Sequence, residues 1–149
     1  MTDPIIVSSP ALWLAAEYRF GEGWLAIEDG RVAQAGTGAF PGTADVSPEG
    51  YIAPGFVDVH THGGGGATFT EGADAARKAI ATHREHGTTT MVASLVTATP
   101  DELIAQMAAL APLVAAGELA GVHLEGPWLC AAHKGAHDPA KLAAPALAQ

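Results

Sequence analysis

Apolar and polar residues alternate in two short runs of the N-terminal third, on either side of Asp29-Gly30 within residues 24–36. This alternation is typical of half-buried strands, and Asp-Gly suits the type I′ turn of a tight hairpin. A further apolar run at residues 5–8 predicts another short strand. Residues 1–53 are therefore expected to form a small β unit, and its few strands need partner strands from elsewhere to close a sandwich.

From Pro54 onwards the pattern changes to strands that alternate with helices. A short run rich in β-branched and aromatic residues predicts a buried strand, and apolar residues at helical spacing follow it. The predicted order is strand, helix, strand, helix, strand at residues 56–59, 74–86, 88–95, 100–116 and 119–124. Such units form parallel sheets. Residues 54–149 therefore predict an α/β fold, the first three βα units of a (β/α)8 barrel, which takes roughly 250 residues when complete.

The second predicted helix has an explicit start signal. Thr99 is a suitable N-cap, Pro100 takes the first helical position, and Glu102 completes a capping box. Pro112 is expected to kink or split this helix, because proline lacks the N–H that the helix needs. After residue 125 we expect a loop and then an alanine-rich tail that is helical in part.

Composition narrows the class of protein. The chain has 149 residues, enough for one sizeable core, and a hydrophobic fraction of 48%, which excludes a disordered chain. Its net charge is −9 with scattered lysine and arginine, so we expect no nucleic-acid partner. It shows no signal peptide and no apolar run of roughly 20 residues, so we expect no membrane partner. A single cysteine, Cys130, favours a reducing compartment, and the expected location is cytoplasmic.

The first candidate chemistry lies at the end of the first barrel strand. His60 and His62 are two residues apart, so on a strand their side chains point to the same face. Two imidazoles that converge at a strand end can bind one cation, whereas a lone strand histidine is usually structural. Four glycines follow at residues 63–66 and allow a sharp turn. They lack the Gly-Lys-Ser/Thr of a phosphate-binding loop.

A carboxylate follows the third predicted strand. Glu125 precedes Gly126-Pro127, which turns the chain away from the strand, and a carboxylate at this position is suited to ligate a divalent cation. His123 shares the face of Glu125 by alternation. We expect His123 to pack inward beside the ligands and not to ligate the metal itself.

The loop at residues 133–138 contains two histidines and a lysine, His133, Lys134 and His137. These side chains are suited to bind an anionic or hydroxyl-rich substrate. The same composition is equally typical of a solvated charged loop, and local composition does not decide between the two. Cys130, nearby, is expected to have a packing role.

These segments together resemble a known family. GFVDVHTHG, after a β segment, resembles the first barrel strand of the amidohydrolase superfamily. HLEGPWLCAAHKGAHDP is more specific and closely resembles the N-acetylglucosamine-6-phosphate deacetylases, in which HLEGP, a short variable stretch and KG-x-H precede Asn or Asp and Pro. The resemblance covers essentially the whole chain, including the hairpin AIEDGRVAQAG, which is typical of the family's small β domain.

The resemblance implies a homodimeric enzyme with a (β/α)8 barrel and a β-sandwich built from both chain ends. Residues 1–53 would be the N-terminal part of the sandwich domain, and residues 54–149 an incomplete N-terminal part of the barrel. The implied reaction converts N-acetylglucosamine 6-phosphate to glucosamine 6-phosphate and acetate, in amino-sugar catabolism or recycling.

The resemblance also implies site residues. Glu125 matches the family's metal-ligating glutamate, and His137 with the backbone of Ala136 matches the pair that contacts the sugar. His60 and His62 match the ligands of members that bind a second metal. Some members have a non-ligand at one of these two positions, so two histidines here favour two metals. The expected cofactor is a divalent metal, zinc or iron(II), with one or two ions per site.

In the family, the general-base aspartate follows a later strand, as do two further histidine ligands and most phosphate contacts. The chain thus looks like an N-terminal part without a catalytic residue of its own, and we expect it to be inactive alone. Two alternatives stay open: another amidohydrolase, such as a cyclic-amide hydrolase or deaminase, and a non-catalytic metal-binding fragment. The former often use a carboxylated lysine after a later strand, whereas Glu125 fills the bridging position here.

Overall fold

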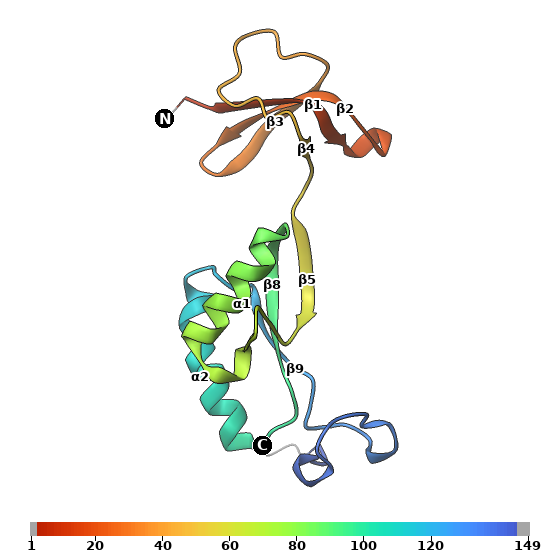
Figure 1. Cartoon of the computed structure of the whole chain (residues 1–149), viewed down its shortest axis with the longest axis vertical. Helices are drawn as coiled ribbons and strands as arrows, with labels where there is room; N and C mark the ends of the chain where they lie inside the picture. Colours follow the sequence, from red (N-terminus) through yellow and green to blue (C-terminus); the bar gives the residue numbers. More distant parts are fainter. Residues whose placement is uncertain (1–2, 146–149) are drawn as a thin grey trace. The chain divides into compact units, whose positions relative to one another are not determined.

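The computed structural model describes residues 3–145 of the chain. These residues form two compact units, Met1–Pro54 and Gly55–Gln149. Each unit has its own sheet, and each is described by itself below (Figure 1).

Unit 1 is built on a four-stranded sheet with the order β3-β2-β1-β4. Its strands are β1 (Ile5–Leu14), β2 (Arg19–Glu28), β3 (Arg31–Thr37) and β4 (Tyr51–Ile52). The predicted hairpin is confirmed, since Asp29 and Gly30 join β2 to β3 with φ of 49° and 74°. Positive φ at both central residues is what a type I′ turn requires.

Strand β1 is longer than the predicted strand at residues 5–8. It continues to Leu14 through an irregularity in its pairing with β2, between Ser9 and Leu12. Pro10 lies at this irregularity, where a residue without an N–H costs the sheet no ladder bond. Beyond it, Leu12 and Leu14 are buried, and a short 3-10 turn, η1 (Ala15–Glu17), leads to β2.

Unit 2 alternates strands and helices, as the pattern predicts. Three parallel strands pair in the order β5-β8-β9. The elements are β5 (Phe56–Thr61), α1 (Ala73–Glu85), β8 (Thr88–Leu95), α2 (Pro100–Ala115) and β9 (Gly121–Leu124). Strand β9 begins two residues later than predicted, because Leu119 packs into the core and its N–H donates to the Leu113 carbonyl.

The core of unit 2 lies between the sheet and its two helices. Alternate residues of β8, namely Met91, Ala93 and Leu95, are buried on the face that α1 and α2 cover. Figure 1 shows both helices on this side of the sheet. The helices contribute small and apolar side chains to the same cluster: Ala76, Ala79 and Ile80 from α1, and Leu103, Leu110 and Leu113 from α2.

The expectation that the first barrel strand is buried is wrong for this chain. Phe56, Val57 and Val59 on β5 are 69%, 65% and 65% exposed. Within the described residues β5 pairs with one strand, β8, and none of its side chains belongs to the buried core. Apolar composition makes a strand suited to burial, but burial itself needs neighbours on its faces.

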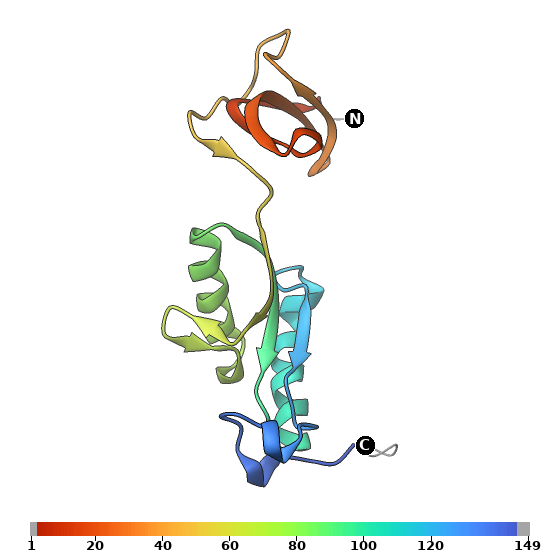
Figure 2. The same cartoon turned by 90° about the vertical axis from the view of Figure 1, so that its right-hand side faces the viewer.

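The four glycines after β5 form a small hairpin that the sequence pattern does not reveal. β6 (Gly63–Gly64) pairs with β7 (Ala67–Thr68), and a 3-10 turn, η2 (Phe69–Glu71), follows. Gly65 and Gly66 make the turn with φ of 61° and 76°, so the expected sharp glycine turn is confirmed. Figure 2 shows this hairpin, in yellow-green, beside α1.

Helix α2 begins as predicted, but it is not split at Pro112. The Thr99 side chain accepts from the Glu102 N–H, Glu102 accepts from the Thr99 N–H, and Pro100 is the first residue. The helix continues through Pro112 to Ala115. One intrahelical bond is lost there, close to the C-terminal end, while Leu110 and Leu113 remain fully buried and anchor this turn.

After β9 the chain is a loop with two 3-10 turns, η3 (Ala131–His133) and η4 (Pro139–Lys141). The expected partial helix in the alanine-rich tail is absent from residues 142–145, and residues 146–149 lie outside the described residues. Among residues 3–145, none of the helices combines the length and the apolar character that a membrane span requires.

Candidate metal centre

The parallel register of unit 2 brings three chain segments to one edge of the sheet. Thr61 of β5 pairs with Ala93 of β8, and Leu95 of β8 pairs with Leu124 of β9. The carboxyl ends of the three strands are therefore level. The residues that follow them, His62, Thr97 and Glu125, lie at the edge where (β/α)8 barrels place their chemistry.

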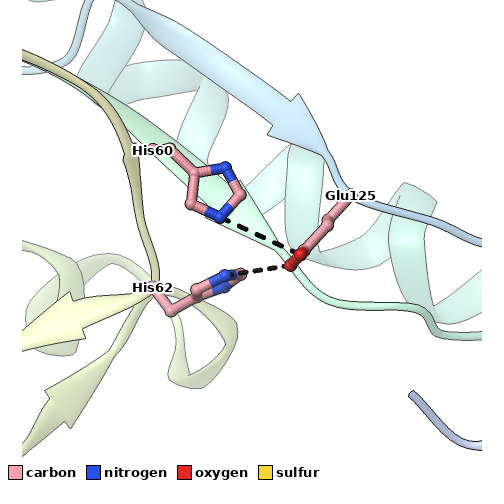
Figure 3. Close-up of side chains that lie close together, drawn as sticks. All are labelled: His60, His62 and Glu125. Atoms are coloured by element: carbon pink, nitrogen blue, oxygen red, sulfur yellow. Dashed lines mark ion pairs between the residues drawn. The ribbon is translucent and has the colours of Figure 1, made fainter. Parts of the chain in front are cut away.

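His60, His62 and Glu125 come together at this edge (Figure 3). The Nε2 atom of His62 is 3.0 Å from Oε2 of Glu125, and Nε2 of His60 is 3.9 Å from Oε1. The two imidazole rings are 5.1 Å apart between centroids, so the alternation along the strand does place them on one face. The three potential ligand atoms lie within 4.8 Å of one another.

This donor set fits a divalent metal ion. Two ligand atoms bound to one tetrahedral zinc at about 2.0–2.1 Å are roughly 3.3 Å apart, close to the separations found here. Imidazole nitrogen and carboxylate oxygen are ligands that zinc and iron(II) accept. The side chains of His60, His62 and Glu125 are 48%, 40% and 31% exposed, so an ion can reach them from solvent.

A third histidine, His137, contacts the same carboxylate from the following loop. Its Nε2 is 3.5 Å from Oε1 of Glu125. Its Nδ1 lies 2.7 Å from the hydroxyl of Thr97, and the Thr97 N–H donates to the same nitrogen at 3.4 Å. The His137 side chain is 12% exposed, so it is held between Thr97 and Glu125 and is not a solvated loop residue.

The rest of this loop borders an open cleft of about 690 Å³. His62, Glu125, Ala136 and His137 are among the residues that line it. Lys134 also lines the cleft, but its ammonium donates to the carbonyls of Gly135 and His137. The lysine therefore stabilises the loop conformation that presents Ala136 and His137.

His123 lies where the alternation places it, on the side of the sheet that faces the candidate ligands. Its ring centroid is 5.3 Å from that of His60, and its Nδ1 is 3.3 Å from the Ser94 hydroxyl. Ser94 is 1% exposed. The expectation that His123 packs inward is wrong, because its side chain is exposed, although it does lie beside a candidate ligand and contacts a buried hydroxyl.

Two histidines at the C-terminal end of α1, His83 within the helix and His86 as its C-cap, have no function assigned from the sequence and make local bonds. The Nε2 atom of His83 is 2.9 Å from the Gly63 carbonyl, and Nδ1 of His86 is 2.8 Å from the Thr82 carbonyl. His83 therefore connects α1 to the residue that follows His62.

No sequence motif indicates Thr97, which contacts His137 through both its side chain and its backbone. A lone threonine has no characteristic ligand spacing. Its position is the available signal, since it closely follows β8 at the edge where the other candidate residues lie.

A charged contact fixes the end of the described loop to α2. The Lys141 ammonium donates to both carboxylate oxygens of Glu102, at 2.9 and 3.1 Å. This bond and the bond from the Thr99 N–H lower the pKa of Glu102 from 4.5 to about 2. The contact connects η4 to the start of α2.

Several solved structures share this fold. N-acetyl-D-glucosamine-6-phosphate deacetylase from Mycobacterium smegmatis, a mutant in complex with N-acetyl-D-glucosamine-6-phosphate, is 42% identical, with a TM-score of 0.87 over 97% of this chain and 38% of that chain. N-acetylglucosamine-6-phosphate deacetylase from Thermotoga maritima is 25% identical, with a TM-score of 0.80 over 95% of this chain and 38% of that chain. The fold class is therefore confirmed: part of a β-sandwich and the first units of a (β/α)8 barrel.

Curated relatives agree with the solved structures. N-acetylgalactosamine-6-phosphate deacetylase from Shewanella sp. (strain ANA-3) is 33% identical over 100 residues, covering 62% of this chain and 25% of that protein. N-acetylglucosamine-6-phosphate deacetylase from Danio rerio is 34% identical over 95 residues, covering 59% of this chain and 24% of that protein. The chain spans about a quarter of the length of these relatives.

The similarity to N-acetylglucosamine-6-phosphate deacetylases that the motifs indicate is thus confirmed, and the wider family follows from a family model. That model, the amidohydrolase family, matches residues 51–148, which include β5, β8, β9 and all three candidate ligands. Because the match covers more than half of the chain, the protein belongs to the amidohydrolase family.

Proposed function

We propose that this chain supplies part of the active site of an enzyme that hydrolyses the acetamide of N-acetylglucosamine 6-phosphate to glucosamine 6-phosphate and acetate. The convergence of His60, His62 and Glu125 at the carboxyl edge of the sheet is the observation that supports it most directly. It gives a metal-binding donor set in a chain similar to deacetylases of 6-phosphorylated amino sugars.

Glu125 is proposed as the ligand on which the reaction depends, and His60 and His62 as ligands of a second ion. The cofactor is zinc or iron(II), with one or two ions per site. A bound ion of this kind would lower the pKa of a coordinated water and polarise a carbonyl oxygen, which is the chemistry that amide hydrolysis at neutral pH requires. The position of Glu125 is compatible with one ion or with two, because Oε2 faces His62 whereas Oε1 faces His137.

Ala136 and His137 are proposed to contact the sugar. Both line the cleft next to Glu125, and Lys134 holds their loop through the His137 carbonyl. A rigid loop that presents backbone groups and an imidazole is suited to a ligand rich in hydroxyl groups. The motif KGAH and the position of both residues at the cleft support these proposed roles.

The general base is proposed to be an aspartate in the part of the relatives that this chain does not span. Two aspartates of unit 2 near the site in sequence have local partners: Asp58 accepts from the His60 N–H, and Asp138, next to His137, accepts from the Ala140 N–H. Each therefore has a structural role, which leaves the proton transfer to the leaving amine for another residue.

The proposal extends to organisation and location. Residues 1–53 are the N-terminal part of a β-sandwich domain, residues 54–149 are part of the barrel, and the complete enzyme is a homodimer without nucleic-acid or membrane partners. A cytoplasmic location follows from the substrate, since a phosphate monoester carries charge and does not cross a bilayer unaided.

A second substrate has a specific observation in its favour. The relative from Shewanella is named for N-acetylgalactosamine 6-phosphate, at an identity close to that of the Danio rerio relative. The two sugars differ in the orientation of one hydroxyl group. A cleft that distinguishes them needs a hydrogen bond that only one of them can make.

The test is acetate release by the longest polypeptide expressed from the gene, loaded with Zn²⁺ or Fe²⁺, on both 6-phosphorylated sugars. We expect a higher kcat/KM for N-acetylglucosamine 6-phosphate. A higher value for the galactose epimer would replace the first substrate with the second. Hydrolysis of a cyclic amide or deamination, with no acetate from either sugar, would contradict both.

A further inference from the structure

Thr97 makes two contacts with one atom of His137. Its hydroxyl lies 2.7 Å from Nδ1, and its backbone N–H donates to Nδ1 at 3.4 Å. Thr97 is 6% exposed, so water does not compete freely for these bonds. It lies in the segment that joins β8 to α2, whereas His137 is 40 residues further along the chain.

These contacts decide which nitrogen of the ring is protonated. A backbone N–H can only donate, so Nδ1 of His137 must accept and has no proton of its own. The neutral ring then has its proton on Nε2. That nitrogen is the one that lies 3.5 Å from Oε1 of Glu125, and as an N–H group it is a donor towards the carboxylate.

The distance to Glu125 is at the outer limit of a hydrogen bond. Contacts of this kind in active sites are often long in the free protein and shorten when the site is loaded. The other oxygen of Glu125, Oε2, is 3.0 Å from His62. His137 and His62 therefore approach the two oxygens of Glu125 separately.

Gly126 gives an independent reason to regard Thr97 as part of the site. A Cβ atom added at Gly126 would lie 1.9 Å from the Thr97 hydroxyl oxygen and 2.9 Å from its Cβ. Any side chain at position 126 would displace the hydroxyl that contacts His137. The glycine directly after Glu125 thus leaves the space that Thr97 occupies.

We propose that Thr97 is a positioning residue. Its hydroxyl and N–H hold His137 in the Nε2–H tautomer, so that His137 donates to Oε1 of Glu125 and leaves Oε2 to face the metal. The inference rests on the metal site proposed above. It makes His137 a partner of the ligand Glu125 and not a ligand itself, because a protonated nitrogen has no lone pair for a metal.

The first measurement needs neither metal nor activity. Long-range ¹H–¹⁵N NMR spectra of the metal-free full chain at pH 8 report which ring nitrogen of each imidazole carries the proton. We expect the Nε2–H tautomer for His137 in the wild type and in Thr97→Ser, which keeps the hydroxyl. Thr97→Val has the same shape without the hydroxyl, and because its backbone N–H can still donate to Nδ1, we expect it to keep the Nε2–H tautomer with one contact fewer on the ring.

The second measurement is Zn²⁺ affinity by isothermal titration calorimetry. Partners that orient a metal ligand typically contribute 10–100-fold to affinity, so we expect Thr97→Val to bind about 10-fold more weakly and Thr97→Ser to bind like the wild type. His86→Gln is the control, since His86 contacts the carbonyl of its own helix. Its affinity should not change.

Three results would overturn the proposal: an Nδ1–H tautomer in the wild type, an unchanged affinity in Thr97→Val, or a metal-induced shift of His137 Nε2 typical of a coordinated nitrogen. If Thr97→Val does not fold, as judged by its amide spectrum, the proposal is tested by the wild-type tautomer and by the tautomer and Zn²⁺ affinity of Thr97→Ser. A wild type that binds no Zn²⁺ would refute the proposed metal site, whereas the tautomer would still test Thr97.

Discussion

At the scale of single residues, Glu125 is the side chain on which the candidate site converges. His60, His62 and His137 all approach its carboxylate, from a strand and from a loop that are far apart in the sequence. A carboxylate surrounded by imidazole nitrogens is suited to a metal ion, because a bound ion would replace these weak contacts with metal–ligand bonds. Its removal should affect metal binding more than any other single substitution in unit 2.

Glu125→Gln keeps the size of the side chain and removes its charge. We expect Zn²⁺ affinity to fall by more than about 100-fold, beyond the loss typical of an orienting partner. Calorimetry and metal analysis of the purified chain measure the effect. Glu118→Gln is the matched control, since Glu118 forms an exposed ion pair with Arg77. Full metal retention in Glu125→Gln would argue against ligation.

Glu102 gives a pH-dependent prediction. Its pKa is lowered from 4.5 to about 2, mainly by the hydrogen bond from Lys141. A group with a lowered folded-state pKa stabilises the fold above the unfolded value, and this contribution disappears as the pH falls from about 4.5 towards 2. Both side chains are partly exposed, so added salt should weaken the effect.

Lys141→Gln removes the main cause of the shift. We expect the pKa of Glu102 to rise towards 4.5, as measured by carboxyl ¹³C titration, and the difference in stability from the wild type to vanish at low pH. Lys78→Gln serves as the control, because Lys78 lies on α1, away from this contact. An unchanged titration of Glu102 in Lys141→Gln would contradict the assignment of the shift to Lys141.

At the scale of elements, the glycine hairpin β6-β7 is the feature most closely connected to the candidate ligands. Gly63 directly follows His62, and its carbonyl lies 2.9 Å from Nε2 of His83 on α1. A Cβ at Gly63 would lie 2.1 Å from the Ala67 carbonyl oxygen. That atom belongs to the backbone of the paired strand, so a clash there moves the hairpin itself.

Gly63→Ala is therefore expected to weaken Zn²⁺ binding as well as stability, because the displaced backbone carries His62 with it. Gly66→Ala is the matched control: its φ is 76°, but a Cβ there meets nothing within 4 Å. We expect Gly66→Ala to lose only about 1–2 kcal/mol of stability from backbone strain, with unchanged affinity. Chemical denaturation measures the loss of stability, and calorimetry measures the loss of Zn²⁺ affinity. Equal affinities in Gly63→Ala and Gly66→Ala would contradict the link between the hairpin backbone and His62.

The capping residues of α2 show how much of an element local sequence can specify. Thr99, Pro100 and Glu102 form the predicted capping box, and its bonds lie within one turn, although Lys141 also contacts Glu102 from a distant loop. Pro112 is the counterexample. Local rules predict a break, but Leu110 and Leu113 are fully buried and keep the turn helical.

At the scale of the whole molecule, β5 is a strand of unit 2 that the rest of the described chain leaves largely uncovered. Phe56, Val57 and Val59 are largely exposed, although they have the composition of a buried strand. The chain spans 38% of the Mycobacterium smegmatis deacetylase that it matches. We propose that the remaining strands and helices of a complete barrel cover this strand.

The same comparison predicts that the 149-residue chain alone does not release acetate from N-acetylglucosamine 6-phosphate. It lacks the proposed general base, while its metal site is expected to bind Zn²⁺. Acetate assays on the purified chain, with the longest polypeptide of the gene as positive control, test this. Measurable deacetylation by the 149-residue chain would contradict the proposed origin of the aspartate.

Sequence by itself determines the local features of this protein. The strand period of two predicts that His60 and His62 share a face, the Asp29-Gly30 hairpin follows from turn chemistry, and the motifs HLEGP and KGAH indicate the family. These properties depend on neighbouring residues in the chain, whose geometry is limited by backbone sterics and local hydrogen bonds.

Only the tertiary structure decides which distant residues meet. The register of β5, β8 and β9 brings Glu125 within 3.0 Å of His62 and His137 within 2.7 Å of Thr97, and no local pattern contains these distances. It also decides that β5 is exposed within the described residues, because burial depends on the elements that pack against a strand and not on its composition.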